Sequence, residues 1–132
     1  MDITLLIGTC DEYSMLWDNL VTLTDRYWSP KCDKIVVSEN KNFEYKGYKS
    51  ITPGNGDWSN RMLRGLDEVD TTYTFFILED YYFTESITSE DINIHMEFLK
   101  EVTGNKVMLE SHNARGYIQL DYGIDGLGRK IT

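Results

Sequence analysis

The sequence predicts an α/β fold in which helices pack on a mostly parallel sheet. Short apolar runs with β-branched residues recur along the chain, which is typical of buried strands. Between them lie segments with apolar residues at three- and four-residue spacing, as in amphipathic helices. This alternation of strands and helices favours a parallel sheet over an antiparallel one. At 132 residues the chain has the length of one domain and can fold without a disulfide or a metal.

The alternation begins at the N-terminus. Residues 3–8 are an apolar run and predict the first buried strand. From Tyr13 the apolar positions recur at helical spacing, and Pro30 ends that helix because proline cannot continue one. Residues 34–38 form the second apolar run and predict the second strand. Residues 48–52 predict a third, weaker strand.

A second helix and a fourth strand follow a clear turn. Residues 53–56 contain proline and two glycines, which is a strong loop signal. A helix over residues 57–69 comes next, and either Asp57 or Ser59 is its N-cap. Residues 73–78 then form a continuous apolar run and predict the fourth strand.

The last third of the chain has a weaker pattern. Ser89 opens a helix that Gly104 ends, and residues 106–109 predict a fifth strand. Residues 112–132 read as an irregular tail with at most one more strand, residues 117–120. We therefore expect a single domain over the whole chain.

Charge and cysteine content limit the function classes. The formal net charge is −9, which argues against a nucleic-acid partner and against docking on anionic lipid through a broad basic surface. Cys10 and Cys32 form no zinc motif and indicate free thiols in a reducing compartment, with a single disulfide as the alternative. The N-terminus lacks the pattern of a signal peptide, and the apolar runs are far below the ~20 residues of a membrane span. We expect a cytoplasmic protein. The alternative is a peripheral protein at the inner face of the membrane.

The most informative feature is the acid pair Glu79 and Asp80 directly after the fourth strand. Ligands of open α/β sheets bind at the carboxyl ends of the strands, where this pair should lie. Acids and hydroxyls also follow the other strands, and the chain has neither a Walker lysine nor a GxGxxG turn. An anionic ligand at such an edge would need a screening cation, and a divalent ion shared by carboxylates and phosphates meets that need. Taken alone, however, such a pair is more often a turn than a metal site.

Taken together, these segments resemble the nucleotide-binding half of a GT-A (family 2-like) glycosyltransferase, from the broad family that builds bacterial surface polysaccharides. The family signature is a helix ending in Gly-Leu-x-x-Ala, a short turn, a Tyr-hydrophobic strand and an acidic triplet. Here Gly65 and Leu66 are followed by the strand from Tyr73 and then by Glu79 and Asp80 at matching spacing. The resemblance covers roughly residues 2 to 110 and implies a Rossmann-like, three-layer α/β/α fold.

The resemblance also implies roles for particular residues. Asp80 takes the position of the metal ligand, for Mn²⁺ or Mg²⁺, and Glu79 that of a supporting acid. The remaining positions matched to nucleotide-sugar contacts are Thr9, Asp11, Glu39, Asp57 and Arg61. Asp57 is equally a helix cap, and Glu39 alone would simply be an exposed acid. The implied partners are a nucleotide-diphosphate sugar, with a UDP-sugar favoured, and a saccharide or lipid-linked acceptor.

The chain departs from the family pattern at two points. Leu78 stands where the first acid of the triplet is expected, which reduces the metal motif to two acids. The stretch after Asp80 is much shorter than the region in which the family builds its acceptor site. We therefore expect a glycosyltransferase of the hexosyl type or its donor-binding half, without a full acceptor subdomain, for which a partner chain could supply the acceptor site. No residue is assigned as the catalytic base.

Two alternatives come from other classes. A response-regulator receiver would use Asp11 and Glu12, a phosphoacceptor at Asp57, and Thr84 with Lys106. The local context disfavours it, because Asp57 follows a glycine-rich turn rather than a buried strand. A non-catalytic nucleotide-sugar-binding module with the same fold is the other alternative, and only an assay separates it from an enzyme.

Overall fold

The computed structural model describes residues 1–102, 106–112, 115–122 and 129–131. Contacts divide the chain into two compact units, Met1–Thr88 and Ser89–Thr132, and each unit has a sheet of its own. No helix in the described part of the chain is long and apolar enough to cross a bilayer.

The first unit is built on a sheet of four parallel strands, so the predicted α/β class is confirmed. The strands are β1 (Ile3–Gly8), β2 (Lys34–Val37), β3 (Lys49–Ile51) and β4 (Tyr73–Leu78). Their order across the sheet is β3-β2-β1-β4, and every neighbouring pair is parallel. The central strand β1 is buried along its whole length, which explains why its sequence is continuously apolar rather than alternating.

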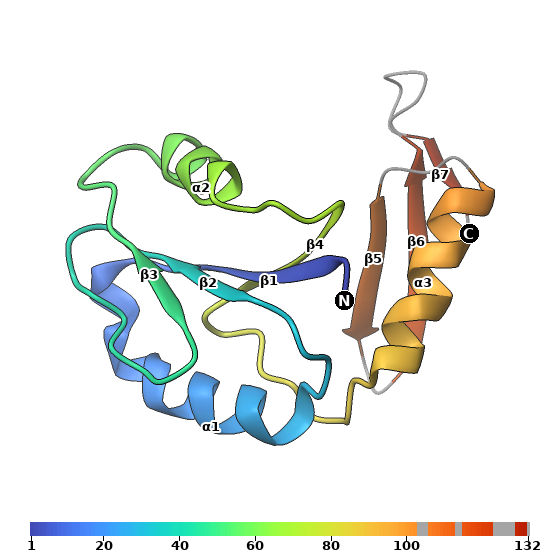
Figure 1. The fold of residues 1–132 in the computed structure, drawn as a ribbon, viewed down its shortest axis with the longest axis horizontal. Helices are drawn as coiled ribbons and strands as arrows, with labels where there is room; N and C mark the ends of the chain where they lie inside the picture. The colour runs from blue at the N-terminus through green and yellow to red at the C-terminus, as the bar shows by residue number, and fades with distance from the viewer. Residues whose placement is uncertain (103–105, 113–114, 123–128, 132) are drawn as a thin grey trace. The chain divides into compact units, whose positions relative to one another are not determined.

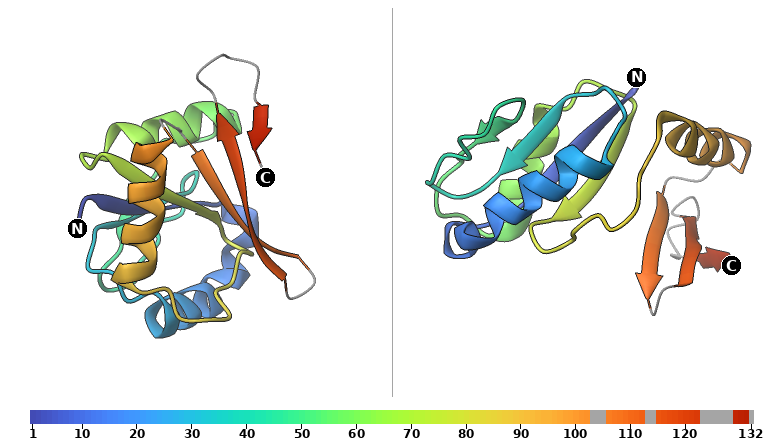
Figure 2. Two further views of the ribbon diagram at one scale, coloured as in Figure 1. Left: turned by 90° about the vertical axis from the view of Figure 1, so that its right-hand side faces the viewer. Right: turned by 90° about the horizontal axis from the view of Figure 1, so that it is seen from below.

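Helices cover the two faces of this sheet. The helix α1 (Trp17–Tyr27), preceded by the 3-10 helix η1 (Asp11–Leu16), lies on one side, and α2 (Trp58–Asp67) lies on the other (Figures 1 and 2). The predicted first helix therefore begins as a 3-10 turn, with Tyr13 outside helical geometry at φ −98° and ψ 17°.

The face under α2 is packed closely. Leu6, Ile35 and Val37 form a buried cluster with Met62 of the helix. A Cβ at Gly65 would lie 2.3 Å from Cγ2 of Val37, so glycine lets the helix backbone approach the strands.

The opposite face is rich in aromatic contacts. The indole of Trp28 lies with its ring centroid 4.8 Å from that of Phe75 on β4 and 5.7 Å from that of Phe83. Residues 81–88 run along this side, and their far end is fixed to the end of α1. There Ile87 donates its backbone N–H to Tyr27 O at 2.8 Å, and Ser29 donates to Ile87 O at 3.0 Å.

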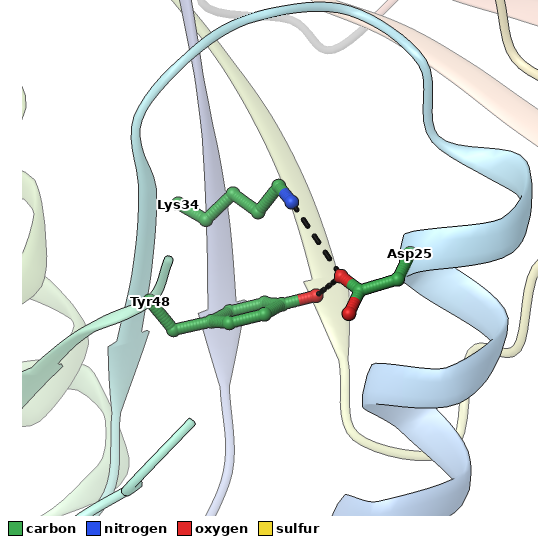
Figure 3. A network of polar contacts seen from close by, with 3 residues as sticks. All are labelled: Asp25, Lys34 and Tyr48. Carbon is green, nitrogen blue, oxygen red and sulfur yellow. Dashed lines mark hydrogen bonds and ion pairs between the residues drawn. The ribbon is translucent and has the colours of Figure 1, made fainter. Parts of the chain in front are cut away.

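Polar side chains connect α1 to the start of β2 and to the segment between β2 and β3. The Tyr48 hydroxyl donates to Asp25 Oδ1 at 2.8 Å, and Lys34 Nζ lies 3.6 Å from the same oxygen (Figure 3). Burial and then the bond to Asp25 raise the pKa of Tyr48. Two turns earlier on the helix, Tyr45 donates to Asp18, and that bond together with burial raises the Tyr45 pKa to about 12.

The second unit combines one helix with an antiparallel sheet. It contains α3 (Ser89–Glu101), followed by the strands β5 (Lys106–His112), β6 (Arg115–Tyr122) and β7 (Arg129–Ile131). The strand order is β5-β6-β7, and both pairs are antiparallel. The predicted fifth strand thus pairs with β6 instead of extending the parallel sheet. Only residues 113–114 separate β5 from β6, and so short a connection suits an antiparallel pair, whereas parallel strands need a crossover. The stretch expected to hold at most one strand holds two.

Candidate functional site

All seven predicted site residues lie in the first unit, at or just beyond the carboxyl ends of the strands or in the first turn of α2. They are Thr9 and Asp11 after β1, Glu39 after β2, Asp57 and Arg61 at the start of α2, and Glu79 and Asp80 after β4. Hydrogen bonds directly connect some of these residues across long stretches of sequence.

Asp11 and Glu39 hold each other. The backbone N–H of Asp11 donates to Glu39 Oε1 at 3.1 Å, and the backbone N–H of Glu39 donates to Asp11 Oδ1 at 3.2 Å. The same aspartate also accepts from the backbone N–H groups of Asn40, at 3.1 Å, and Lys41, at 3.0 Å. The carboxylate of Asp11 therefore anchors the loop after β2, and its oxygens are occupied by the protein itself.

The pKa of Asp11 reflects this anchoring. Partial burial alone would raise it, but the hydrogen bonds from the backbone of Lys41, Asn40 and Glu39 outweigh burial and lower the pKa from 3.8. A carboxylate that accepts several backbone N–H bonds is held in its charged form.

Thr9 is also occupied internally. Its side chain is buried, and its hydroxyl oxygen accepts a hydrogen bond from Trp17 Nε1 at 3.0 Å. This bond positions the start of α1 against the end of β1. A ligand at this edge would meet the rim of the Thr9 loop rather than the Thr9 hydroxyl.

Arg61 is the most unusual group of the site. Only 7 % of the residue is exposed, although arginine is rarely buried without a partner charge. Its Nη1 donates to Thr9 O at 2.8 Å, while its buried Nε has no hydrogen-bond partner. None of the ion pairs among the described residues includes Arg61. A buried positive charge thus lies where β1 ends.

The acid pair divides into one buried and one exposed carboxylate. Glu79 is 8 % exposed, and its pKa is raised chiefly by burial and further by the negative charge of Asp80, against its own backbone N–H bond and the opposing charge of Arg61. Asp80 is exposed to solvent. Glu79 and Arg61 are therefore close enough to interact electrostatically, and Asp80 is the acid accessible to a ligand.

The acids do not form a ready-made metal site. Among the described residues there is no group of three or more histidine, cysteine, aspartate or glutamate side chains that could hold an ion. A divalent cation at Asp80 would need oxygens from a bound ligand to complete its coordination.

Asp57 has a clear local role. It is the N-cap of α2, because its Oδ1 accepts from the backbone N–H of Asn60 at 2.8 Å. This settles which of the two candidate caps is used. It also places the residues of the receiver hypothesis in separate roles, since Asp57 caps a helix while Asp11 anchors a loop.

Trp58 was not among the predicted site residues. It is the first residue of α2 and lies directly after the N-cap Asp57. It is one turn before Met62, which would place both on one face of the helix, yet 48 % of Trp58 is exposed, whereas Met62 is buried.

Comparison with known proteins adds no family assignment: no protein-family model matches the chain, and neither a curated protein nor a solved structure matches it.

Proposed function

We propose that the first unit is the donor-binding domain of a GT-A-like glycosyltransferase and binds a nucleotide-diphosphate sugar at the carboxyl edge of its sheet. The observation that carries the proposal is the buried guanidinium of Arg61, which lies close enough to Glu79 to interact with its charge but forms no ion pair among the described residues and has an Nε without a hydrogen-bond partner. Burying such a group is costly. An anionic ligand would supply the missing acceptor and further negative charge.

The α/β class of the first unit agrees with this assignment. A parallel sheet with one helix on each face is compatible with the three-layer, Rossmann-like arrangement of this enzyme family. Ligands of such sheets bind in the crevice outside the carboxyl ends of the strands, which is where the seven residues gather.

In this proposal the residues bind the diphosphate from two sides. Arg61 supplies positive charge from within the sheet edge, close to the carbonyl of Thr9. Asp80 would hold Mn²⁺ or Mg²⁺ jointly with the phosphate oxygens, with Glu79 in support. The ion would stabilise the negative charge of the departing diphosphate.

The proposed reaction is the transfer of a hexosyl group to a saccharide or lipid-linked acceptor. The bond between the anomeric carbon and the diphosphate oxygen breaks, and a bond from the acceptor hydroxyl oxygen to that carbon forms. The hydroxyl proton passes to a base for which we name no residue. Such an enzyme would act in the cytoplasm or at the inner face of the membrane, where a partner chain could complete the acceptor site.

A thermal-shift experiment tests the donor site. UDP, GDP and CMP are each added with and without Mn²⁺, and we expect UDP with Mn²⁺ to raise the melting temperature most. A ligand at about 100 times its Kd adds about 2.7 kcal/mol of stability, which is a shift of several degrees. The Asp80→Asn variant should lose the part of the shift that depends on Mn²⁺, whereas Glu12→Gln, another exposed acid, should keep it.

The outcomes separate the candidate functions. If no nucleotide stabilises the protein, the donor site is wrong. If nucleotides bind but no glycosyl transfer or sugar-nucleotide hydrolysis is detected, the non-catalytic binding module is the better description. If beryllofluoride with Mg²⁺ stabilises the protein and Asp57→Asn abolishes that effect, the receiver hypothesis replaces both.

A further inference from the structure

We infer that Trp58 is a stacking platform for a pyranose ring at the carboxyl edge of the sheet, a role that deepens the proposed function and rests on it. All three tryptophans of the chain lie in the described residues. Trp17 and Trp28 are 3 % and 4 % exposed, whereas Trp58 is 48 % exposed. Exposing so much of a large aromatic ring forgoes the gain that its burial would bring.

The register of the sheet indicates where Trp58 lies along the direction of the strands, relative to the ends of β1 and β4. Gly8, the last residue of β1, pairs with Leu78. A Cβ on Gly8 would lie 2.7 Å from Met62 Sδ, so Met62 lies over this last pair of residues. Trp58 precedes Met62 by one turn, about 6 Å along the helix axis. Trp58 therefore lies beyond the last pair of strand residues, on the side of the turn that contains Glu79 and Asp80 and is closed by the bond from the Tyr81 N–H to Leu78 O.

The helix direction agrees with this placement. Arg61, in the first turns of α2, donates to Thr9 O, one residue beyond the end of β1. The N-terminal end of α2 therefore lies at the carboxyl edge, and Trp58 lies nearer to that end than Arg61 does.

A neighbouring aromatic ring supports the indole. The centroids of Trp58 and Phe76 are 6.0 Å apart with their planes at 83°, an edge-to-face contact. Phe76 is itself 41 % exposed, and Tyr81, directly after Asp80, is 57 % exposed. The edge thus combines a supported indole with a further exposed ring.

The chemistry around Trp58 indicates a sugar. One face of a pyranose ring presents C–H groups that pack on an aromatic ring, while its hydroxyls need hydrogen-bond partners. Asp80 and the exposed amide side chain of Asn60 offer such partners. The net charge of −9 disfavours an anionic polymer on this surface. The ring is either that of the donor sugar or that of the acceptor, and the arms of the experiment distinguish these two sources.

Acrylamide quenching of tryptophan fluorescence tests the inference, because Trp58 is the accessible tryptophan. Quenching is measured with UDP, with UDP-glucose, with maltotriose, and with tetralysine as a basic peptide. Protection of Trp58 by UDP-glucose but not by UDP assigns the platform to the donor sugar. Protection by maltotriose with UDP bound assigns it to the acceptor. The Trp58→Phe variant identifies the Trp58 signal by difference, because Trp17 and Trp28 remain.

Affinity measurements provide an independent readout. Removing a stacking aromatic weakens binding of a nucleobase by about 1–3 kcal/mol, so Trp58→Ala should raise the Kd of the protecting sugar at least about 5-fold. Trp58→Phe should recover part of this loss. Leu63→Ala, which removes another exposed apolar side chain of α2, should leave the Kd unchanged.

The remaining outcomes keep the two proposals apart. If UDP raises the melting temperature but no sugar protects Trp58, the platform is wrong and the donor site stands. If maltotriose protects Trp58 while no nucleotide stabilises the protein, the platform stands without the donor site. Protection by tetralysine alone would overturn the platform in favour of a peptide-binding surface, and protection by none of the probes would overturn it outright.

Discussion

At the scale of single residues, Asp11 shows how one carboxylate can organise a binding edge without touching a ligand. Its oxygens accept backbone N–H bonds from Glu39, Asn40 and Lys41. These bonds connect the end of β1 to the loop after β2. The positions of any ligand contacts on that loop depend on them, together with the bond from Lys41 Nζ to the Ser14 hydroxyl oxygen at 2.9 Å.

We predict that Asp11→Ala lowers the free energy of unfolding by about 2 kcal/mol, because hydrogen bonds to a charged group contribute more than neutral ones. Asp57→Ala, which removes one helix cap, should cost about 1 kcal/mol. Urea denaturation of both variants measures the two losses. Equal losses would show that the Asp11 bonds add nothing beyond a simple cap.

The pH dependence of the same residue follows from the sign of its pKa shift. The folded-state pKa is below 3.8, so the stabilisation is fully present above that value and is lost as the pH falls through the folded pKa. The stability difference between the wild type and Asp11→Ala should therefore shrink below about pH 4. A difference that stays constant down to pH 2 would contradict this origin.

The internal roles of Thr9, Asp11 and Glu39 could not be predicted from the sequence. The partner of Asp11 is 28 residues away, and Thr9 is reached by Arg61 from 52 residues away. Sequence spacing correctly placed these residues at one edge of the sheet. It could not show which polar atoms the protein itself would occupy, because that depends on contacts between loops.

At the scale of elements, the contact of α2 with the sheet depends on Gly65. An alanine there gains about 1 kcal/mol in helix propensity, but its Cβ would lie 2.3 Å from Cγ2 of the fully buried Val37. A β-branched side chain on a central strand has little freedom to move, and overpacking typically costs about 1–3 kcal/mol.

We therefore predict a net loss of up to about 2 kcal/mol for Gly65→Ala, measured by urea denaturation. Gly56→Ala is the matched control, because the nearest atom to its new Cβ is Arg61 Cγ at 4.0 Å. Its free energy of unfolding should change by no more than about 0.5 kcal/mol. A stabilised Gly65→Ala variant would show that α2 can move away from the strands without cost.

The elements themselves were predicted unequally, for physical reasons. The apolar runs of β1 and β4 gave their bounds correctly. The run of β1 is apolar because this strand is buried throughout, whereas β4 is an edge strand in which half-buried and exposed residues alternate as far as Phe76. The sequence did not predict that the first helix begins as a 3-10 turn. The geometry of this turn follows from the anchoring of Asp11 rather than from helical spacing. The partner of β5 was also missed, because an apolar run does not reveal which strand it pairs with.

At the scale of the whole molecule, the division into two units separates the candidate site from the rest of the chain. All seven predicted residues and Trp58 belong to Met1–Thr88. This unit contains the complete parallel sheet and both of its helices. A unit with its own core is expected to fold by itself.

The boundary of that unit can be located by two truncations. Residues 81–88 contribute Phe83, which contacts Trp28, and Ile87, which bonds to Tyr27 and Ser29 at the end of α1.

We predict that a chain of residues 1–88 unfolds cooperatively in urea and binds UDP with the Kd of the full chain. A chain of residues 1–80 keeps the acid pair but loses these contacts, so its unfolding midpoint should fall well below that of residues 1–88. Trp17 and Trp28 fluorescence follows both transitions. If residues 1–88 show no cooperative transition, the first unit depends on the second for its stability; if residues 1–80 are as stable as 1–88, the segment after Asp80 is not part of the first core.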